Sequence, residues 1–340
     1  MNYKRKIFGK LLSLLLVGCI GAGCGSTAEK MKESSRAEQK ESDLPSESVG
    51  AKKEEGKSGT EKKLKLTVTT SFLQDMASVL AGDFTDITLV IPAGEDPHTY
   101  EAKPEDHEKF KNAELVLYHG LHFEGKMTEL LEAVHGVPVT ADFKKEDLIT
   151  MEEGGGEVTD PHFWFDTALY QEAVKKAASS LEEKLPEHKQ EIEKNCAAYL
   201  DQLDSLKSYC AEQIEKIPEG SRILVTPHDA FNYFSRSYGI EVKAPQGVST
   251  DAELSTSDMA ETADFIVSHK IKAIFSESTT DPARMEKLRE SCKAKGWEVS
   301  VVRGEGKELF SDSLAPKGQD GDNYIDMVKH NVDLIVSNLE

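Results

Sequence analysis

The stretch LKLTVTTSFLQDMASVLA, residues 64–81, passes from a β-rich run into an amphipathic helical pattern. Residues 64–70 predict a strand, and residues 72–81 predict a helix. Further strands are predicted at 86–91, 115–119 and 137–140, separated by helices near 104–112 and 125–134. Strands that alternate with helices favour a parallel sheet with right-handed crossovers, so this part of the chain predicts an α/β fold.

A long helical stretch follows, and the strand–helix alternation then resumes. Residues 167–185 carry apolar side chains at helical spacing, with Asp166 as the predicted N-cap and Pro186 as the end. A second helix is predicted from 187 to 217. Beyond it, the predicted elements are strands at 222–226, 273–276 and 298–302 and helices at 230–238, 256–269, 282–295 and 324–338.

Residues 64–340 are too many for one typical hydrophobic core. We therefore predict an α/β protein with two parallel-sheet lobes joined by one long helix. The predicted lobes are residues 64–165 and 187–340, and the predicted linking helix is residues 166–186.

The first residues have the pattern of a targeting signal. Basic residues at positions 4–6 and 10 precede an apolar run at 11–22 that is too short to span a membrane. The run ends in Gly21-Ala22-Gly23-Cys24, which resembles a bacterial lipobox, so we predict a signal peptide at 1–23 and lipidation of Cys24. Cys19 also fits the pattern, with a shorter apolar run, and an ordinary secretory signal is a further alternative. In each case the mature chain works outside the cytoplasm.

Residues 24–63 have the composition of a disordered tether. From residue 25 onward they hold nine acidic and nine basic side chains and no aromatic residue, so they cannot bury enough apolar surface to fold. The signal carries four positive charges and the tether none net, so the overall charge of −20 leaves −24 on residues 64–340. Such an acidic surface excludes nucleic acid as a partner and direct adsorption to anionic lipid.

Three cysteines fall in the part that we expect to fold. Cys196 and Cys210 lie on one predicted helix about 21 Å apart, too far to bridge each other. Cys292 could pair with either of them, or all three could be buried small residues. No CxxC pattern is present, which disfavours a thiolate metal site.

The sequence lacks the common catalytic and nucleotide-binding motifs HExxH, GxGxxG, GxxxxGK[ST] and GxSxG. It places histidines and acids in predicted loops instead. His98, His162 and His228 each directly follow a proline, and Asp312 lies in the segment ELFSDSL. Ligands bind outside the carboxyl ends of the strands in open α/β sheets, so at least His98 and His228 can face a common crevice.

The chemistry of these four residues suits a metal. Imidazoles bind zinc and its neighbours, and three imidazoles with one carboxylate complete a tetrahedral shell. The prolines at 97, 161 and 227 restrict the backbone beside each histidine. Since loop histidines are commonly exposed and inert, the spacing alone leaves that alternative open.

Six segments resemble the metal-binding solute receptors of zinc and manganese ABC importers, the ZnuA/TroA-like family. They are GEDPHTYEAKPED, ELVLYHGLHFEGKM, DPHFWFDT, ILVTPHDAFNYFSRSYGI, AIFSESTTDPARM and ELFSDSLAPKGQDGDNYIDMVKHNV, in the order of the family and across essentially all of residues 64–340. The resemblance implies two α/β lobes joined by a rigid helix, with one metal in the cleft between them. Its metal ligands correspond to His98, His162, His228 and Asp312.

Two features of the sequence bear on the metal. The loop at about 144–159 lacks the histidines that many zinc members carry there, whereas His228 stands where many manganese-specific members have glutamate. Manganese prefers oxygen-rich shells, so we favour Zn²⁺ with Mn²⁺ as the alternative. The resemblance further implies a monomeric lipoprotein, anchored to the cell membrane, that passes its metal to the permease of an ABC importer. A zinc-dependent hydrolase and a surface adhesin are the rival interpretations, and we expect no enzyme.

The other histidines are assigned to packing or to the surface. We expect this of His119 and His122, with a place beside the metal ligands as the alternative, and of the histidines at 107, 135, 188, 269 and 330. Glu277, at the end of a predicted strand, could orient a ligand imidazole. Because binding requires neutral imidazoles, we expect metal affinity to fall below about pH 6.

Overall fold

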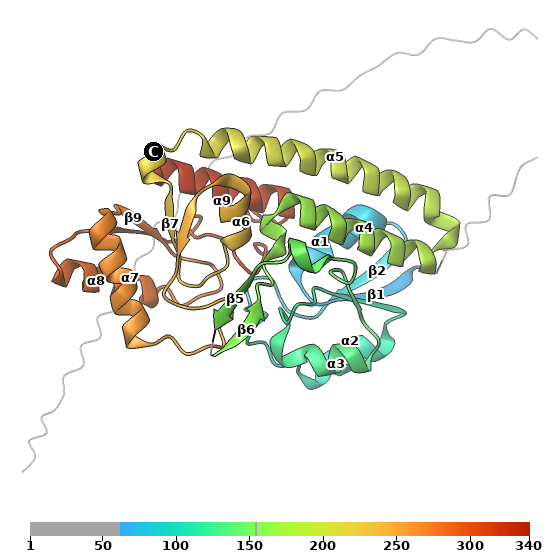
Figure 1. Ribbon diagram of the computed structural model, residues 1–340. Coiled ribbons are helices and arrows are strands. Elements are labelled where there is room, and N and C mark those ends of the chain that lie inside the picture. The colour runs from blue at the N-terminus through green and yellow to red at the C-terminus, as the bar shows by residue number, and fades with distance from the viewer. Residues whose placement is uncertain (1–61, 154) are drawn as a thin grey trace, which may run out of the picture. The chain divides into compact units, whose positions relative to one another are not determined.

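The computed structural model describes residues 62–153 and 155–340. The predicted signal peptide at 1–23, the lipidation site at Cys24, the alternative at Cys19 and almost all of the predicted tether lie outside these residues. Within them, the structure is α/β with parallel sheets and a long helix, which confirms the predicted class (Figure 1).

A four-stranded parallel sheet forms the first half of the fold, in the order β2-β1-β3-β4. Its strands are β1 (Leu64–Val68), β2 (Thr85–Leu89), β3 (Leu115–Tyr118) and β4 (Val137–Pro138), and its helices are α1 (Ser71–Ala81), α2 (Pro104–Asn112), η1 (Gly125–Met127) and α3 (Thr128–Ala133). Thr70 caps α1 by accepting a hydrogen bond from the backbone N–H of Leu73. The strand β1 pairs with β2 on one side and β3 on the other, and its apolar residues Leu64, Leu66 and Val68 are all buried.

The segment that we predicted as a loop contains an antiparallel hairpin. After η2 (Lys145–Asp147), β5 (Thr150–Glu153) pairs with β6 (Gly156–Thr159). The sequence pattern missed these strands because they are short and largely polar, with little apolar alternation to mark them. Gly155 supports the reversal, since its φ of +83° is one that glycine adopts without steric cost.

Two helices connect the halves. After η3 (Phe163–Phe165), α4 (Thr167–Lys184) starts at the predicted cap, where Asp166 accepts hydrogen bonds from the backbone N–H groups of Ala168 and Leu169. Past η4 (Pro186–His188), the long helix α5 (Lys189–Ile214) packs against α1 and α4 and also against α9 of the second half (Figure 1). The predicted division into lobes at 64–165 and 187–340 with a linker at 166–186 stays a prediction.

The second half contains two parallel strand pairs, β7-β8 and β9-β10. After η5 (Glu219–Ser221), its elements are β7 (Ile223–Val225), α6 (Asn232–Tyr238), β8 (Glu241–Lys243), α7 (Thr256–His269), β9 (Ala273–Phe275), α8 (Ala283–Ala294), β10 (Ser300–Val302) and α9 (Tyr324–Leu339). The strand β8 was not predicted, because Glu241 and Lys243 leave it only one apolar residue. No helix in the described part of the chain combines the length and apolarity needed to cross a membrane.

The three cysteines at positions 196, 210 and 292 form no disulfide. Cys196, Cys210 and Cys292 are all buried and free, so the buried-residue interpretation is confirmed and a disulfide with Cys292 is wrong. Cys292 packs in a cluster beneath α7 and α8, while the other two lie on the buried face of α5.

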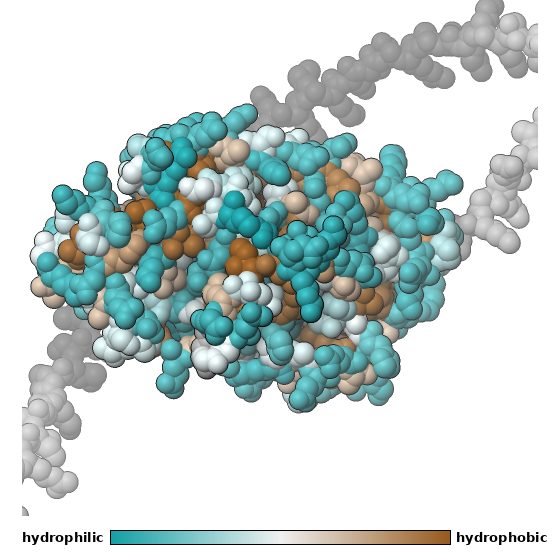
Figure 2. Space-filling view, viewed as in Figure 1, coloured by the Kyte–Doolittle hydropathy of each residue, from teal (hydrophilic) through white to brown (hydrophobic). Residues whose placement is uncertain are grey.

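Figure 2 shows hydrophilic residues over most of one face, with apolar residues in scattered areas.

Candidate metal centre

The structure brings the four predicted residues together at one point. The Nε2 atom of His162 lies 3.3 Å from the Nε2 atoms of both His98 and His228. Asp312 faces them, with Oδ1 3.2 Å from Nε2 of His162 and Oδ2 3.3 Å from Nε2 of His228. One donor atom from each of the four residues lies within 4.8 Å of all the others.

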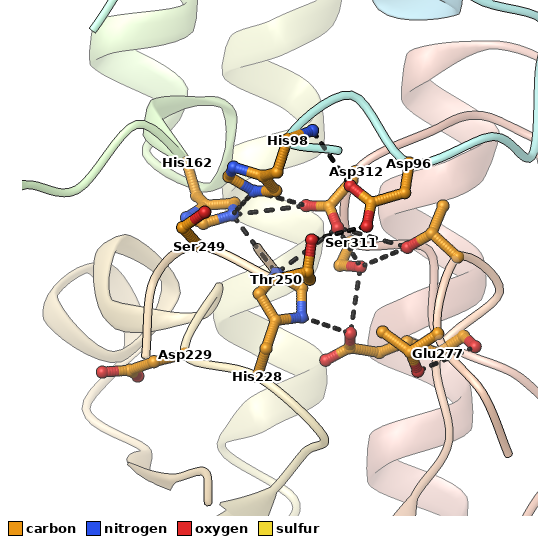
Figure 3. Close-up of polar contacts among 12 residues, drawn as sticks. Asp96, His98, His162, His228, Asp229, Ser249, Thr250, Glu277, Ser311 and Asp312 are labelled. Atoms are coloured by element: carbon orange, nitrogen blue, oxygen red, sulfur yellow. Dashed lines mark hydrogen bonds and ion pairs between the residues drawn. The ribbon is translucent and has the colours of Figure 1, made fainter. Parts of the chain in front are cut away.

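Each of the four side chains comes from a different loop. His98 follows β2, His162 directly precedes η3, His228 follows β7, and Asp312 follows a β-bridge between Glu277 and Leu309. Figure 3 shows their side chains converging from the surrounding segments. Two loops belong to each half of the fold, so the cluster lies where the halves meet.

The spacing and burial of the cluster suit a small cation. Ligands at about 2.0–2.1 Å from a tetrahedral zinc lie about 3.3 Å from one another. Four of the donor separations are 3.2–3.3 Å, and the Nε2 of His98 is 4.0 Å from Oδ1 of Asp312. All four residues are at most 3% exposed. Donor atoms this close together and this well shielded from water are better satisfied by a bound metal ion than by contacts with one another.

Two of the histidine loops share an aspartate–proline–histidine turn. The Oδ1 of Asp96 accepts the backbone N–H of His98 at 3.0 Å, and the Oδ1 of Asp160 accepts that of His162 at 2.9 Å. Proline between them offers no N–H, so the carboxylate binds the next donor along the chain. In the third loop, the hydroxyl of Thr226 donates to the carbonyl of His228 at 2.9 Å.

Carboxylates hold the outer nitrogens of two imidazoles. Nδ1 of His162 lies 2.8 Å from Oδ1 of Asp160, and Nδ1 of His228 lies 2.5 Å from Oε2 of Glu277. Such contacts fix the ring and leave Nε2 directed at the cluster. This role was predicted from the sequence for Glu277 but not for Asp160. The repeated Asp-Pro-His triplet, at 96–98 and 160–162, was the available signal.

The two oxygens of Asp312 have different surroundings. Oδ2 accepts hydrogen bonds from the hydroxyls of Ser311 and Thr279, both at 3.2 Å. Oδ1 is buried without a hydrogen-bond partner in the described part of the chain. Its near neighbours are Nε2 of His162 at 3.2 Å and Nε2 of His98 at 4.0 Å, so a cation bound by these imidazoles would also meet Oδ1. Sequence reasoning missed both hydroxyls, since nothing in the local pattern marks them.

The electrostatics of the cluster favour positive charge. Burial lowers the pKa of His162, but Asp160 and Asp312 outweigh it and raise that pKa to about 9. Burial is likewise outweighed at His228, where Glu277 and Asp312 hold the pKa well above its usual range. The same two histidines overcome burial at Asp312 and keep its pKa well below the usual range.

His98 behaves differently from the other two histidines. Burial, together with the neighbouring His162 and His228, lowers its pKa to about 3 despite the opposing effect of Asp312. Its ring packs edge-on against Phe123, with the centroids 5.0 Å apart. His98 is therefore a neutral nitrogen donor over the whole physiological range of pH.

The remaining histidines lie outside the cluster. His119 is buried among aromatic rings, and its Nε2 contacts the hydroxyl of Thr70 at 2.8 Å. These contacts fit the packing role that we expected for it. His122 is exposed, with a left-handed backbone at φ 64°. The histidines at 107, 135 and 269 are exposed, and those at 188 and 330 are partly buried.

One cleft leads to the cluster from the outside. It has a volume of about 630 Å³, and of the four clustered residues only His98 lines it. Its walls come from the turn at 121–126, from β6 and from residues 248–251 of the second half. Of the four clustered residues in the described structure, His98 is thus the one that borders this cleft.

Three imidazoles and a carboxylate, buried where two α/β halves meet, are typical of proteins that bind a transition metal. The chain belongs to the family described as component A, periplasmic, of the zinc-uptake complex, whose model matches residues 66–338.

Curated relatives and solved structures agree with this family. The chain is 36% identical over 289 residues to the manganese-binding lipoprotein MntA of Bacillus subtilis, covering 84% of this chain and 92% of MntA. It is 40% identical over 279 residues to the zinc-binding protein TroA of Treponema pallidum, covering 81% and 88%.

The fold is shared with solved structures of TroA. The periplasmic zinc-binding TroA of Treponema pallidum superposes with a TM-score of 0.78 at 39% identity, covering 82% of this chain and 99% of TroA. A TroA structure from a study of its metal-binding specificity gives a TM-score of 0.81 at 57% identity, covering 82% and 100%.

Proposed function

We propose that this chain is an extracytoplasmic lipoprotein, anchored through Cys24, that captures one divalent transition metal and delivers it to the permease of an ABC importer. The proposed metal ligands are His98, His162, His228 and Asp312. The observation that carries the proposal is the convergence of four buried donor atoms within 4.8 Å. The names of the relatives, a manganese-binding lipoprotein and a zinc-binding protein, support it.

Zinc is the metal that we propose, with manganese as the alternative. Thr279 donates a hydrogen bond to Oδ2 of Asp312, and Oδ1 accepts none in the described part of the chain, so we propose Oδ1 as the metal donor. The set is then three nitrogens and one oxygen, with Nε2 of His162 3.2–3.3 Å from each of the other three donors, and zinc accepts such a set readily. Manganese favours six oxygen-rich positions, and a site this buried offers few.

The arrangement suits carriage of a metal. The ion enters through the cleft, meets His98 first, and is then enclosed by His162, His228 and Asp312. Four protein ligands leave no coordination position for a reactive water, which hydrolysis needs and transport does not. Because two ligands come from each half of the fold, separation of the halves breaks up the four-ligand set and releases the ion to the importer.

Metal analysis of the purified protein tests this proposal. We expect one zinc per chain after purification from metal-replete cells, and zinc should displace manganese in competition. His162→Ala should lose the metal, whereas the exposed control His107→Ala should retain it. Stoichiometric metal that survives His162→Ala would contradict the proposed site, and the absence of metal binding in the wild type would contradict the function.

A further inference from the structure

A short segment of the second half closes over the cluster. We call residues 247–251 the strap. Gln246, just before it, forms a β-bridge with the ligand His228, and the backbone N–H of Asp229 donates to the carbonyl of Gly247 at 3.2 Å. The side-chain amide of Gln246 also donates to the carbonyl of Thr250 at 3.0 Å. One end of the strap is thus fixed beside a ligand of the second half.

The other end of the strap contacts the first half. The hydroxyl of Thr250 donates to Oδ2 of Asp96 at 2.5 Å, and Oδ1 of the same carboxylate accepts the backbone N–H of His98 at 3.0 Å. Figure 3 shows Ser249 and Thr250 beside the clustered side chains, with Asp96 next to Asp312. A chain of two hydrogen bonds therefore runs from the strap to the backbone of His98.

This chain matters because His98 is held less firmly than the other two histidines. Asp160 and Glu277 contact the Nδ1 atoms of His162 and His228. Within residues 62–153 and 155–340, Nδ1 of His98 has no hydrogen-bond partner. Its ring packs against Phe123 and against the rings of His162 and His228, and the side chain that holds its backbone is Asp96.

We propose that Thr250 is a positioning residue that acts through Asp96 to hold His98 against the metal. Seating the strap then completes the four-ligand site, and lifting it loosens the ligand that lines the cleft. His98, the first ligand that the ion meets on entry, is then also the first ligand to release it. The inference rests on the proposed function, since it names what controls the exchange of the metal at that site.

A second contact holds the strap more weakly. Nζ of Lys126 lies 3.4 Å from a carboxylate oxygen of Asp251 and 3.2 Å from one of Glu101. These side chains are 38% to 77% exposed, so the ion pairs are screened by solvent and salt. Asp251→Asn should therefore change the rate of zinc release less than twofold at physiological salt.

Zinc release from the full chain to a fluorescent chelator, followed by stopped flow, tests the role of Thr250. Thr250→Val keeps the shape of the side chain and removes the hydroxyl, so we expect release about tenfold faster, as for loss of a hydrogen bond to a carboxylate. Thr250→Ser retains the hydroxyl and should release zinc at close to the wild-type rate. In an Asp96→Ala background, Thr250→Val should add little, because the shared contact is already gone.

The outcomes separate this inference from the proposed function. If the wild type binds zinc and Thr250→Val releases it at the wild-type rate, the positioning role is wrong and the function stands. If valine and serine accelerate release equally, the hydroxyl is not what holds His98, and the inference again fails. If the wild type binds no metal, the proposed function itself fails. Unfolding of the metal-free variants in urea shows whether a faster release follows from lost stability, which would also overturn the inference.

Discussion

Nδ1 of His228 lies 2.5 Å from Oε2 of Glu277, and both side chains are buried. A carboxylate accepts, so the imidazole donates from Nδ1 and turns Nε2 toward the cluster. The hydroxyl of Ser311 lies 3.2 Å from the same oxygen and 3.2 Å from Oδ2 of Asp312, so its single hydrogen is shared between these two carboxylates. The ring of His228 is thereby held in one orientation before any metal arrives.

Glu277→Gln should weaken zinc binding without removing a metal ligand. Glutamine has nearly the same shape, but it lacks the charge that supports the imidazole, and such changes cost about 10–100-fold in metal affinity. Competition with a chelator at pH 7 measures the effect. Asp160→Asn should act in the same direction on His162, and affinities equal to wild type in both variants would contradict the orienting role.

The pH dependence of binding should begin higher than ordinary histidines predict. The raised pKa of His162, about 9, and that of His228 mean that both rings carry protons at pH 7 in the metal-free protein. The metal must displace those protons, so affinity should fall steadily as pH decreases from about 9 rather than only below about 6. His98, with a pKa near 3, contributes nothing to this slope above about pH 4.

Calorimetry in buffers of different ionisation enthalpy measures the number of protons displaced. We expect zinc binding at pH 7.5 to release between one and two protons per metal, whereas unperturbed imidazoles would release almost none. A value near zero would show that the acids around the cluster do not keep these rings protonated.

Much of the fold was predictable because its helices carry their own signals. Pro104 begins α2 and Ser255 caps α7, and both helices have the predicted bounds. The strands β5, β6 and β8 were missed because three or four mostly polar residues show little periodicity. Their pairing depends on contacts between segments, which a pattern along the chain does not record.

The site shows the same limit. The motifs predicted which four residues would gather, but not what surrounds them. Thr279 and Asp312 are 33 residues apart, and Thr250 and Asp96 are 154 apart, so neither contact is visible as spacing. Asp160 could have been predicted from the sequence, because its Asp-Pro-His triplet repeats that of Asp96. Residues that orient ligands are set by tertiary structure more than by local sequence.

The three cysteines of the folded part should be inert in the native protein. Burial raises the pKa of Cys210 to about 11 and also raises those of Cys196 and Cys292, so thiolate is scarce at pH 8. A thiol reagent should leave all three unlabelled in buffer and label all three in denaturant, as located by peptide mapping. Reducing agents should not change the unfolding midpoint, and a reductant-dependent midpoint would indicate a disulfide.

Asp312→Ala should distinguish a carrier with four protein ligands from a three-histidine zinc enzyme. If about 12 kcal/mol of binding is shared by four ligands, each supplies about 3 kcal/mol, or about a hundredfold in affinity. Zinc at about 100 times the wild-type dissociation constant should then stabilise the wild type by about 2.7 kcal/mol and the variant by only about 0.4 kcal/mol. Urea unfolding with and without zinc measures both values, with His107→Ala as the matched control. An enzyme that binds zinc through three histidines would keep the full stabilisation in Asp312→Ala, because water would occupy the fourth position.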